Sequence, residues 1–333
     1  MKRPQVVIVS PALADANNGN WQTARRWQRA LGERYFARIV RDWPDSAAAQ
    51  ADCAMLALHA RRSAPSIAAW AGVRGRTGLA VVLTGTDLYR DIDHDAQAQA
   101  SLALAQRLVV LQDQGRHAVP EAWRDKTEVI FQATARRQTL PKTRRHLRAV
   151  MVGHLRDEKD PRTLMRAAHL LTNEASIHID HIGAPLDASL AQAARDTAAR
   201  CPHYRWLGVQ PHLVTLARIQ RAHVLVHASH MEGGAHVVME AVCSGTPVLA
   251  SRIPGNVGML GADYAGYFEA GDAQGLAALL RRCHADLTDP AALPASHSCL
   301  AQLQAQCAAR APLFSPQHEQ AALLRLMDQL WKP

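Results

Sequence analysis

The sequence predicts an α/β protein of two doubly wound, Rossmann-like domains that face each other across a cleft. Three observations support this fold class. Short apolar segments alternate with segments of helical periodicity along all 333 residues. The apolar segments are near-continuous runs of Val, Leu and Ile, as parallel strands buried on both faces require. The alternation is interrupted once, by a polar and basic segment, and then begins again, which indicates two βαβ series.

The first domain is predicted to span residues 1–147. Helices are expected over 21–31 and from Ser63 onward, and strands over 5–11, 36–42, 52–60, 79–87, 107–112 and 127–133. The segment TARRQTLPKTRRHLR follows these elements. Because it contains Pro141 and has almost no apolar periodicity, we place the domain boundary there.

The second domain is predicted to span residues 148–312, with a further amphipathic helix from Gln317 to Trp331. Strands are expected over 148–155, 177–183, 204–208, 222–228 and 247–251. Helices are expected over 161–171, 187–200, 212–221, 235–245 and 273–284. Pro161 and Gly245 lie where a helix begins and ends, respectively.

Charge is unevenly distributed along the chain. The formal net charge is +9, and residues 1–148 carry 23 Lys and Arg against 13 Asp and Glu. A basic first domain can bind nucleic acid or attract a small anionic substrate. No nucleic-acid module is recognisable, so the sequence favours a small anion, with part of the excess forming an ordinary solvated surface.

No segment reaches the roughly 18–20 apolar residues that span a bilayer. The N-terminal MKRPQVVIVSP is basic and then apolar, but its apolar part is too short for a signal peptide. We therefore expect a first strand, a cytoplasmic protein and no stable membrane association. The six Cys residues form no C-x-x-C pair, so the sequence indicates neither a structural zinc site nor a thioredoxin-like site.

The segment HASHMEGGAHVVMEAVCSGTPVLAS (227–251) joins a predicted strand, a loop and a helix. Ligands of open α/β sheets bind beyond the carboxyl ends of the strands, where a helix N-terminus stabilises an anion. Glu232 precedes Gly233 and Gly234, and Glu240 lies about 9 Å further along the helix axis. Two carboxylates at this spacing suit an elongated ligand with hydroxyl groups at both ends and a diphosphate between them, such as a sugar nucleotide.

A second strand–loop–helix segment, VGHLRDEKDPRTLMRA (152–167), lies at the matching end of the first strand of this domain. His154, Arg156 and Lys159 offer cations near a helix N-terminus. A diphosphate leaving group requires such neutralisation in the transition state. An ordinary charged loop is the alternative interpretation.

Candidate acceptor groups follow the strands of the first domain. In NNGNWQTARRW (17–27), Gly19 permits close approach, Asn20 and Thr23 offer hydrogen bonds, and Arg26 can reach an anion. By the same strand-end argument, three further side chains are expected to point to the cleft, namely His59, Thr86 and Asp87.

These motifs resemble those of GT-B glycosyltransferases of the large retaining family 4. The pattern S-x-x-E-G-G-x-x-V-x-x-E-A-x-x-S-G-T-P-V-L-A-S is similar to the E-x7-E region of that family, and VGHLRDEKDP looks like its V-G-R-L-x-x-E-K-G segment. The resemblance implies a metal-independent, cofactor-free hexosyltransferase in which the C-terminal domain binds a nucleotide-sugar donor. It also implies that segment 313–333 returns to the first domain.

The resemblance assigns roles residue by residue. Lys159 would hold the diphosphate with Gly153, His154 and Arg156 around it, although the family has Arg where this chain has His154. Glu232 would contact the donor sugar or order the acceptor, and Glu240 would bind the ribose. Backbone N–H groups would come from Gly233, Gly234 and Ala235.

A narrower resemblance is to bacterial selenosugar synthases of selenoneine biosynthesis. It rests on NNGNWQTARRW, LHARRSAPS, TGTDLY and VGHLRDEKDP. It implies transfer of the sugar of a UDP-sugar, UDP-N-acetylglucosamine or UDP-glucose, to selenophosphate, with Lys159, Glu232 and His59 as the catalytic group. Alternatives are a family 4 transferase with a hydroxyl acceptor and a non-catalytic protein that binds nucleotide sugars.

Overall fold

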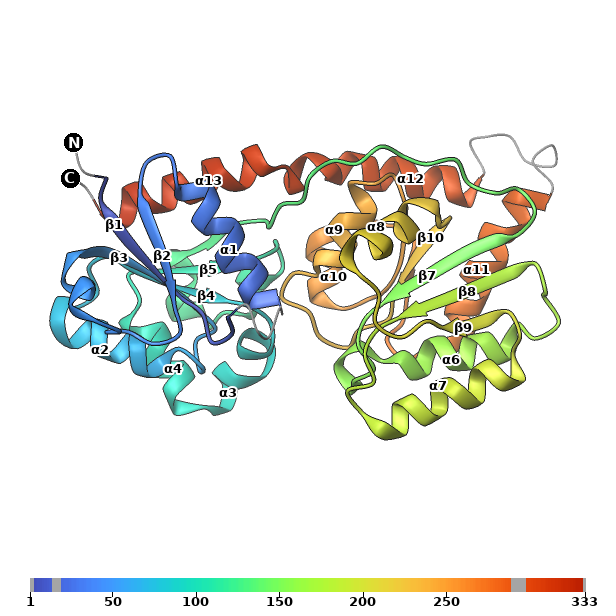
Figure 1. The fold of residues 1–333 in the computed structure, drawn as a ribbon, viewed down its shortest axis with the longest axis horizontal. Helices are drawn as coiled ribbons and strands as arrows, with labels where there is room; N and C mark the ends of the chain where they lie inside the picture. The colour runs from blue at the N-terminus through green and yellow to red at the C-terminus, as the bar shows by residue number, and fades with distance from the viewer. Residues whose placement is uncertain (1–2, 14–18, 289–297, 332–333) are drawn as a thin grey trace. The chain divides into compact units, whose positions relative to one another are not determined.

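The computed structural model describes residues 3–13, 19–288 and 298–331. Its contacts divide the chain into two compact units. The first unit holds Met1–Ala133, Glu232–Gly234 and Leu313–Pro333, and the second holds Thr134–Met231 and Ala235–Pro312. Each unit contains a six-stranded parallel sheet with helices packed on it (Figure 1).

The sheet of the first unit has the strand order β2-β1-β3-β4-β5-β6. Its strands are β1 (Gln5–Val9), β2 (Phe36–Val40), β3 (Asp52–Leu58), β4 (Leu79–Leu83), β5 (Arg107–Val110) and β6 (Thr127–Val129). The direction of winding reverses between β1 and β3, so the topological switch point lies there. The loops that follow these two strands are therefore the expected ligand loops of this sheet.

Helices cover both faces of the first sheet. They are α1 (Gly19–Leu31), α2 (Ala64–Arg74), α3 (Ile92–His94), α4 (Ala96–Leu104), α5 (Gly115–Ala118) and the C-terminal α13 (Pro316–Leu330), which packs beside α1 (Figure 1). Alternate strand residues belong to two separate cores, because successive side chains of a strand point to opposite faces. Val7 and Met55 lie in one core, and Ile8 and Leu56 in the other.

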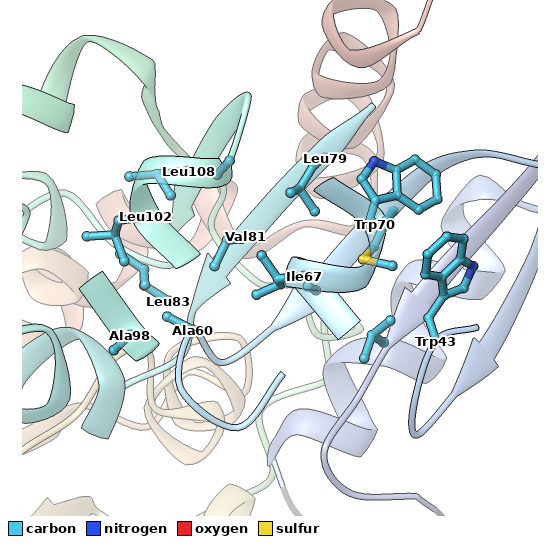
Figure 2. Close-up of a cluster of buried hydrophobic side chains, with 14 of the residues drawn as sticks. Trp43, Ala60, Ile67, Trp70, Leu79, Val81, Leu83, Ala98, Leu102 and Leu108 are labelled. Carbon is cyan, nitrogen blue, oxygen red and sulfur yellow. The ribbon is translucent and has the colours of Figure 1, made fainter. Parts of the chain in front are cut away.

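The first of these cores contains two tryptophans. Figure 2 shows Trp43 and Trp70 beside Ile67 and the β4 residues Leu79 and Val81. The two indole rings are 5.0 Å apart between centroids. The second core is completed by side chains of α13, namely Ala322, Leu323, Leu326, Met327 and Leu330. From Leu313 onward the chain belongs to the first unit.

The sheet of the second unit has the order β12-β11-β10-β7-β8-β9, which places its switch point between β7 and β10. Its strands are β7 (Leu147–Val152), β8 (Ile177–Ile182), β9 (Tyr204–Trp206), β10 (Val224–His227), β11 (Val248–Ser251) and β12 (Tyr267–Phe268). Its helices are α6 (Pro161–Leu170), α7 (Ala188–Arg200), α8 (His212–Arg221), α9 (His236–Val242), α10 (Pro254–Leu260), α11 (Ala273–Thr288) and α12 (Cys299–Arg310).

The boundary between the units follows Ala133, whereas the sequence analysis places it after residue 147. Segment 134–147 forms hydrogen bonds with other residues of the second unit. The Arg137 N–H donates to the Cys243 carbonyl at 2.9 Å, the Gln220 side chain donates to the Gln138 carbonyl at 2.6 Å, and the Thr139 hydroxyl donates to the Ser244 carbonyl at 3.2 Å. Charge and proline content do not reveal such backbone contacts.

Most predicted strands continue one or more residues beyond their true carboxyl ends. The strand predicted over 79–87 ends at Leu83, because the next backbone N–H groups turn to the carboxylate of Asp87. Helices α4, α10 and α12 were not predicted; α4 and α12 are rich in Ala and Gln and lack a strong apolar stripe. Within the described ranges, none of the helices combines the length and the apolarity needed to cross a membrane.

Candidate functional site

The two donor-site motifs lie in loops that the second sheet brings together. One loop follows β7 and the other follows β10, on either side of the switch point. The His230 N–H donates to the Glu158 carbonyl at 2.9 Å, and His230 Nε2 lies 3.4 Å from Asp160 Oδ2. Two loops separated by some seventy residues of sequence thus lie in contact at the carboxyl edge of this sheet.

Gly153 is positioned by the end of β8. Its N–H donates to the Ile182 carbonyl at 2.9 Å, and its own carbonyl accepts from His181 Nε2 at 3.3 Å. A Cβ on Gly183 would lie 1.9 Å from the Gly153 oxygen, so only glycine fits at position 183. The sequence analysis identified neither His181 nor Gly183 as site residues, although both lie at the carboxyl end of a predicted strand.

His181 is a buried, neutral histidine. Its Nδ1 lies 3.0 Å from the Tyr204 hydroxyl, which donates to it while Nε2–H donates to Gly153. Burial lowers the pKa of His181 to about 4. The side chain therefore holds the Gly153 loop as a neutral hydrogen-bond donor.

Lys159 ends a short 3-10 turn and precedes Asp160, whose φ of 42° lies in the left-handed region. The Asp160 carboxylate caps α6 by accepting from the N–H of Thr163 at 3.2 Å and from its hydroxyl at 2.5 Å. The Lys159 stem passes over Gly153, with its Cγ 3.5 Å from where a Gly153 Cβ would lie. The stem of Lys159 thus lies at ordinary contact distance over Gly153.

His154 is not one of the site's cations. Its Nδ1 accepts from the Ala184 N–H at 3.0 Å, and partial burial together with Arg156 and Lys159 lowers the pKa of His154. It is therefore neutral at pH 7, which corrects the expectation of three cations in this loop. Arg156 is exposed, with its Nε 3.9 Å from Glu158 Oε2.

The loop after β10 contains Glu232, Gly233 and Gly234 and leads into α9. These three residues are assigned to the first unit. Glu232 is partly exposed. Ala235 precedes α9, and its N–H donates to Met259 Sδ at 3.2 Å. That sulfur is a weak acceptor, so the predicted role of Ala235 as a donor to the diphosphate stays a prediction.

Glu240 faces α8. Its Oε1 accepts from His212 Nε2 at 2.8 Å, and the Glu240 side chain is 12% exposed against 71% for His212. This hydrogen bond raises the pKa of His212. The sequence analysis missed His212, whose only signal is its position at the start of the predicted helix that follows β9.

In the first unit, His59 lies at the switch point of the sheet. It follows β3, has a φ of 73° and is almost fully buried. Its Nε2 lies 3.1 Å from the Thr86 hydroxyl, and its Nδ1 accepts from the Arg62 N–H at 3.3 Å. Burial lowers the pKa of His59, so the ring is neutral and carries its proton on Nε2.

Asp87 organises the backbone of this site. It is fully buried, and its carboxylate accepts from the N–H groups of Ala60, Thr84 and Gly85 at 2.8–2.9 Å. These bonds give Asp87 a structural role, and its predicted contact with the acceptor stays a prediction. Asp91, which the sequence analysis did not identify, lies 3.9 Å from His59 Nε2 and 3.1 Å from Arg61 Nε.

The predicted acceptor loop is described only in part, because Asn17 and Asn18 lie outside the described residues. Gly19 begins α1 with open space around its Cα, and Asn20 follows it. Thr23 is buried; its hydroxyl donates to the Gly19 carbonyl at 2.8 Å and accepts from the Gln132 side chain. The Thr23 hydroxyl therefore stabilises the first turn of α1, and its predicted contact with the acceptor stays a prediction.

Arg26 is also used internally. Its Nε lies 2.7 Å from an oxygen of Glu319, a buried residue of α13 that also accepts from Trp27 Nε1 at 2.8 Å. The guanidinium thus joins α1 to α13, so Arg26 has a structural role in addition to the predicted contact with an anionic acceptor. Glu319 lies far from Arg26 in sequence, so no local pattern could have revealed the pair.

His59 and Asp160 are the two non-glycine residues with positive φ in the described chain. Each lies in a loop at the switch point of its own sheet. Such conformations cost about 1–3 kcal/mol and cluster at functional sites. Among the described residues, no three His, Cys, Asp or Glu side chains are grouped to hold a metal ion.

Residues 132–291 match the family model of glycosyl transferases group 1. No curated protein matches the sequence at a significant level. Among solved structures, sucrose-phosphate synthase from Thermosynechococcus elongatus is similar with a TM-score of 0.72 at 16% identity, over 99% of both chains. HepE of Anabaena in complex with UDP and glucose is similar with a TM-score of 0.69 at 14% identity, over 98% of this chain and 100% of that one.

TarM of S. aureus is similar with a TM-score of 0.60 at 12% identity, over 82% of this chain, and the chain spans 55% of the length of that protein. At these sequence identities the similarity to solved structures shows the fold alone. The family match lies almost wholly in the second unit. The two Rossmann-like units have the fold of GT-B glycosyltransferases, and residues 132–291, just under half of the chain, match the model of glycosyl transferases group 1.

Proposed function

We propose that the chain is a selenosugar synthase, which transfers the sugar of UDP-N-acetylglucosamine or UDP-glucose to selenophosphate. The observation that carries the donor half is the meeting of the Lys159 loop and the His230 loop at the switch point of a group 1 glycosyltransferase domain. HepE, which is similar in fold, binds UDP-glucose, and this supports a UDP-sugar donor here.

In this proposal Lys159 neutralises the diphosphate, and Arg156 lies beside it in the same loop. Glu240, held by His212, accepts hydrogen bonds from the ribose hydroxyls. Glu232 contacts the donor sugar, and Gly233 and Gly234 let the backbone approach it. His154 contributes a neutral N–H and no charge, because its Nδ1 is occupied by Ala184.

The acceptor half rests on the first unit. The segments NNGNWQTARRW, LHARRSAPS and TGTDLY, on which the resemblance to selenosugar synthases rests, provide α1, the His59 loop and the Thr86 turn. Arg62 is exposed beside His59, and the first 148 residues carry the positive charge of the chain. With Arg26 and Asp87 used internally, Arg62 and the Thr86 hydroxyl replace them as the groups that meet the anion.

The reaction balances without a redox partner or a metal. The selenium of selenophosphate attacks the anomeric carbon, a C–Se bond forms, and the C–O bond to UDP breaks as its electron pair leaves with the diphosphate. Water then attacks phosphorus, the Se–P bond breaks, and the products are inorganic phosphate and a selenol sugar. Because the nucleophile is already anionic, no strong general base is needed.

Mass spectrometry of reactions with each component omitted in turn tests the proposal. The protein is incubated with UDP-N-acetylglucosamine or UDP-glucose and with selenophosphate. A selenium-containing sugar and UDP, formed only in the complete mixture, are the expected products. UDP formed equally without selenophosphate would contradict the acceptor and favour a hydroxyl, and the absence of UDP from every mixture would contradict the donor.

A further inference from the structure

A pocket lies in the second unit, beside α8 and the first half of β7. Its volume is about 430 Å³, and we call it the α8 pocket. It is lined by Arg148, Asp180, Leu213, Val214, Ala217, Arg218 and Arg221. Arg148 lies four residues before the carboxyl end of β7, roughly 13 Å along the strand from the loop that contains Lys159. No residue of the donor-site loops lines this pocket.

The charge of the α8 pocket is only partly balanced. Asp180 is buried and accepts from Arg205 at 2.6 and 2.9 Å and from Arg218 Nη1 at 3.0 Å. That carboxylate is therefore satisfied by two guanidinium groups. Within the described part of the chain, neither Arg148 nor Arg221 has a carboxylate partner.

Two guanidinium N–H groups in this pocket have no acceptor. Arg148 Nε and Arg218 Nε are both buried atoms without a hydrogen-bond partner among the described residues. Leaving a buried donor unsatisfied costs about 1–3 kcal/mol, and more when the group is charged. Beside Arg148, the Nε2 of His146 lies 3.5 Å from Arg148 Nη2, and His146 stacks on His178, so these two rings add no negative charge. These two nitrogens are covered, but the guanidinium groups of Arg148, Arg218 and Arg221 line the pocket, where an oxyanion would balance their charge.

The remaining wall is apolar. Leu213 and Val214 are 71% and 40% exposed, and Ala217 lies one helical turn further along α8. Residues three and four apart share a helix face, so α8 presents its apolar side chains next to Arg218 and Arg221. The pocket thus joins a cationic end to an apolar end, in a volume within the range of small-molecule sites.

We propose that the α8 pocket binds a small organic anion, a phosphate monoester or carboxylate on an apolar body, at a site separate from the donor site. The anionic group accepts from Arg148, Arg218 and Arg221. The apolar body covers Leu213 and Val214. The proposal does not depend on the identity of the acceptor or on UDP as the donor.

Isothermal titration calorimetry with phenyl phosphate tests this site. The titration is repeated with benzyl alcohol, with benzoate and with inorganic phosphate, each with and without saturating UDP. We expect phenyl phosphate or benzoate to bind at least about tenfold more tightly than benzyl alcohol, because charge-assisted hydrogen bonds are about twice as strong as neutral ones. Binding should persist in the presence of UDP.

Matched variants locate the site. Arg148→Gln with Arg221→Gln should weaken phenyl phosphate binding at least about tenfold, whereas Arg195→Gln, an exposed arginine of α7, should not change it. Leu213→Ala, at an exposed position that cannot disturb folding, should weaken phenyl phosphate but not inorganic phosphate. Absence of binding, equal loss in the Arg195→Gln control, or displacement by UDP would each overturn the proposal. A donor site that fails to bind UDP leaves these comparisons intact.

Discussion

At the scale of single residues, Glu240 is the group whose removal tests the donor site most directly. Glu240→Gln keeps the shape of the side chain but removes its charge, and charge-assisted hydrogen bonds are about twice as strong as neutral ones. We expect UDP affinity, measured by isothermal titration calorimetry, to fall about tenfold. Glu269→Gln, the same change at an exposed position, is the control. Equal affinities in both variants would remove Glu240 from the site.

Arg26 joins α1 to α13 through its ion pair with Glu319, and a substitution of Arg26 tests this structural role. Arg26→Ala leaves the buried Glu319 without its guanidinium, and breaking a buried ion pair costs about 3–5 kcal/mol. Because the Arg26 side chain is 21% exposed, we expect the free energy of unfolding, measured with urea, to fall by about 2–3 kcal/mol. Arg25→Ala, on the exposed side of the same helix, should have little effect. An Arg26→Ala protein of unchanged stability with a raised KM for the acceptor would instead support the prediction that Arg26 binds the acceptor.

The buried His181 makes the free energy of unfolding depend on pH. Its folded pKa of about 4 lies below the value near 6.5 of an unfolded histidine, so below pH 6.5 the unfolded state binds a proton that the folded state rejects. Stability therefore falls as the pH falls, down to the folded pKa. Between pH 7 and pH 5 this amounts to about 2 kcal/mol. Urea unfolding at both pH values should show a smaller loss for His181→Gln than for the unaltered protein, and equal losses would contradict the assignment.

At the scale of elements, α13 acts as part of the first unit although it is last in sequence. Leu326 is fully buried in the core that Ile8 and Leu56 also form. Leu326→Ala should cost about 2–5 kcal/mol in unfolding free energy, through lost burial and the cavity that remains. Arg325→Ala, the exposed neighbour, should change stability by less than about 0.5 kcal/mol. A similar small change at Leu326 would show that α13 is not required by this core.

The strands and their order of appearance could be predicted from the sequence because strands buried on both faces leave continuous apolar runs. The rule that parallel strands present their loops at one edge predicts where the loops of Lys159 and His59 lie, whereas Glu240 belongs to α9. What could not be predicted were the partners supplied by distant elements. Glu319 bonds Arg26, and His212 bonds Glu240, and in neither pair does a local pattern connect the two residues.

At the scale of the whole molecule, two sheets of different strand order place their ligand loops by the same rule. In the first, His59 follows β3 at the switch between β1 and β3, and in the second, Asp160 lies in the loop after β7 at the switch between β7 and β10. Each of these residues has a positive φ that its hydrogen bonds maintain. The two halves of the proposed reaction, donor binding and acceptor binding, can therefore be tested in separate variants.

The charge of the chain gives the last prediction. Residues 1–148 carry ten more positive than negative charges, and the proposed acceptor is a small anion. Salt shortens the Debye length from about 10 Å at 0.1 M to about 3 Å at 1 M, so the KM for selenophosphate should rise with KCl concentration. Arg62→Gln should raise this KM at low salt and flatten its salt dependence, while Arg144→Gln, an exposed arginine of segment 134–147, should change neither. A KM that is independent of salt in steady-state assays would mean that the acceptor is uncharged, as a sugar hydroxyl is, and would leave the positive charge as a property of the surface alone.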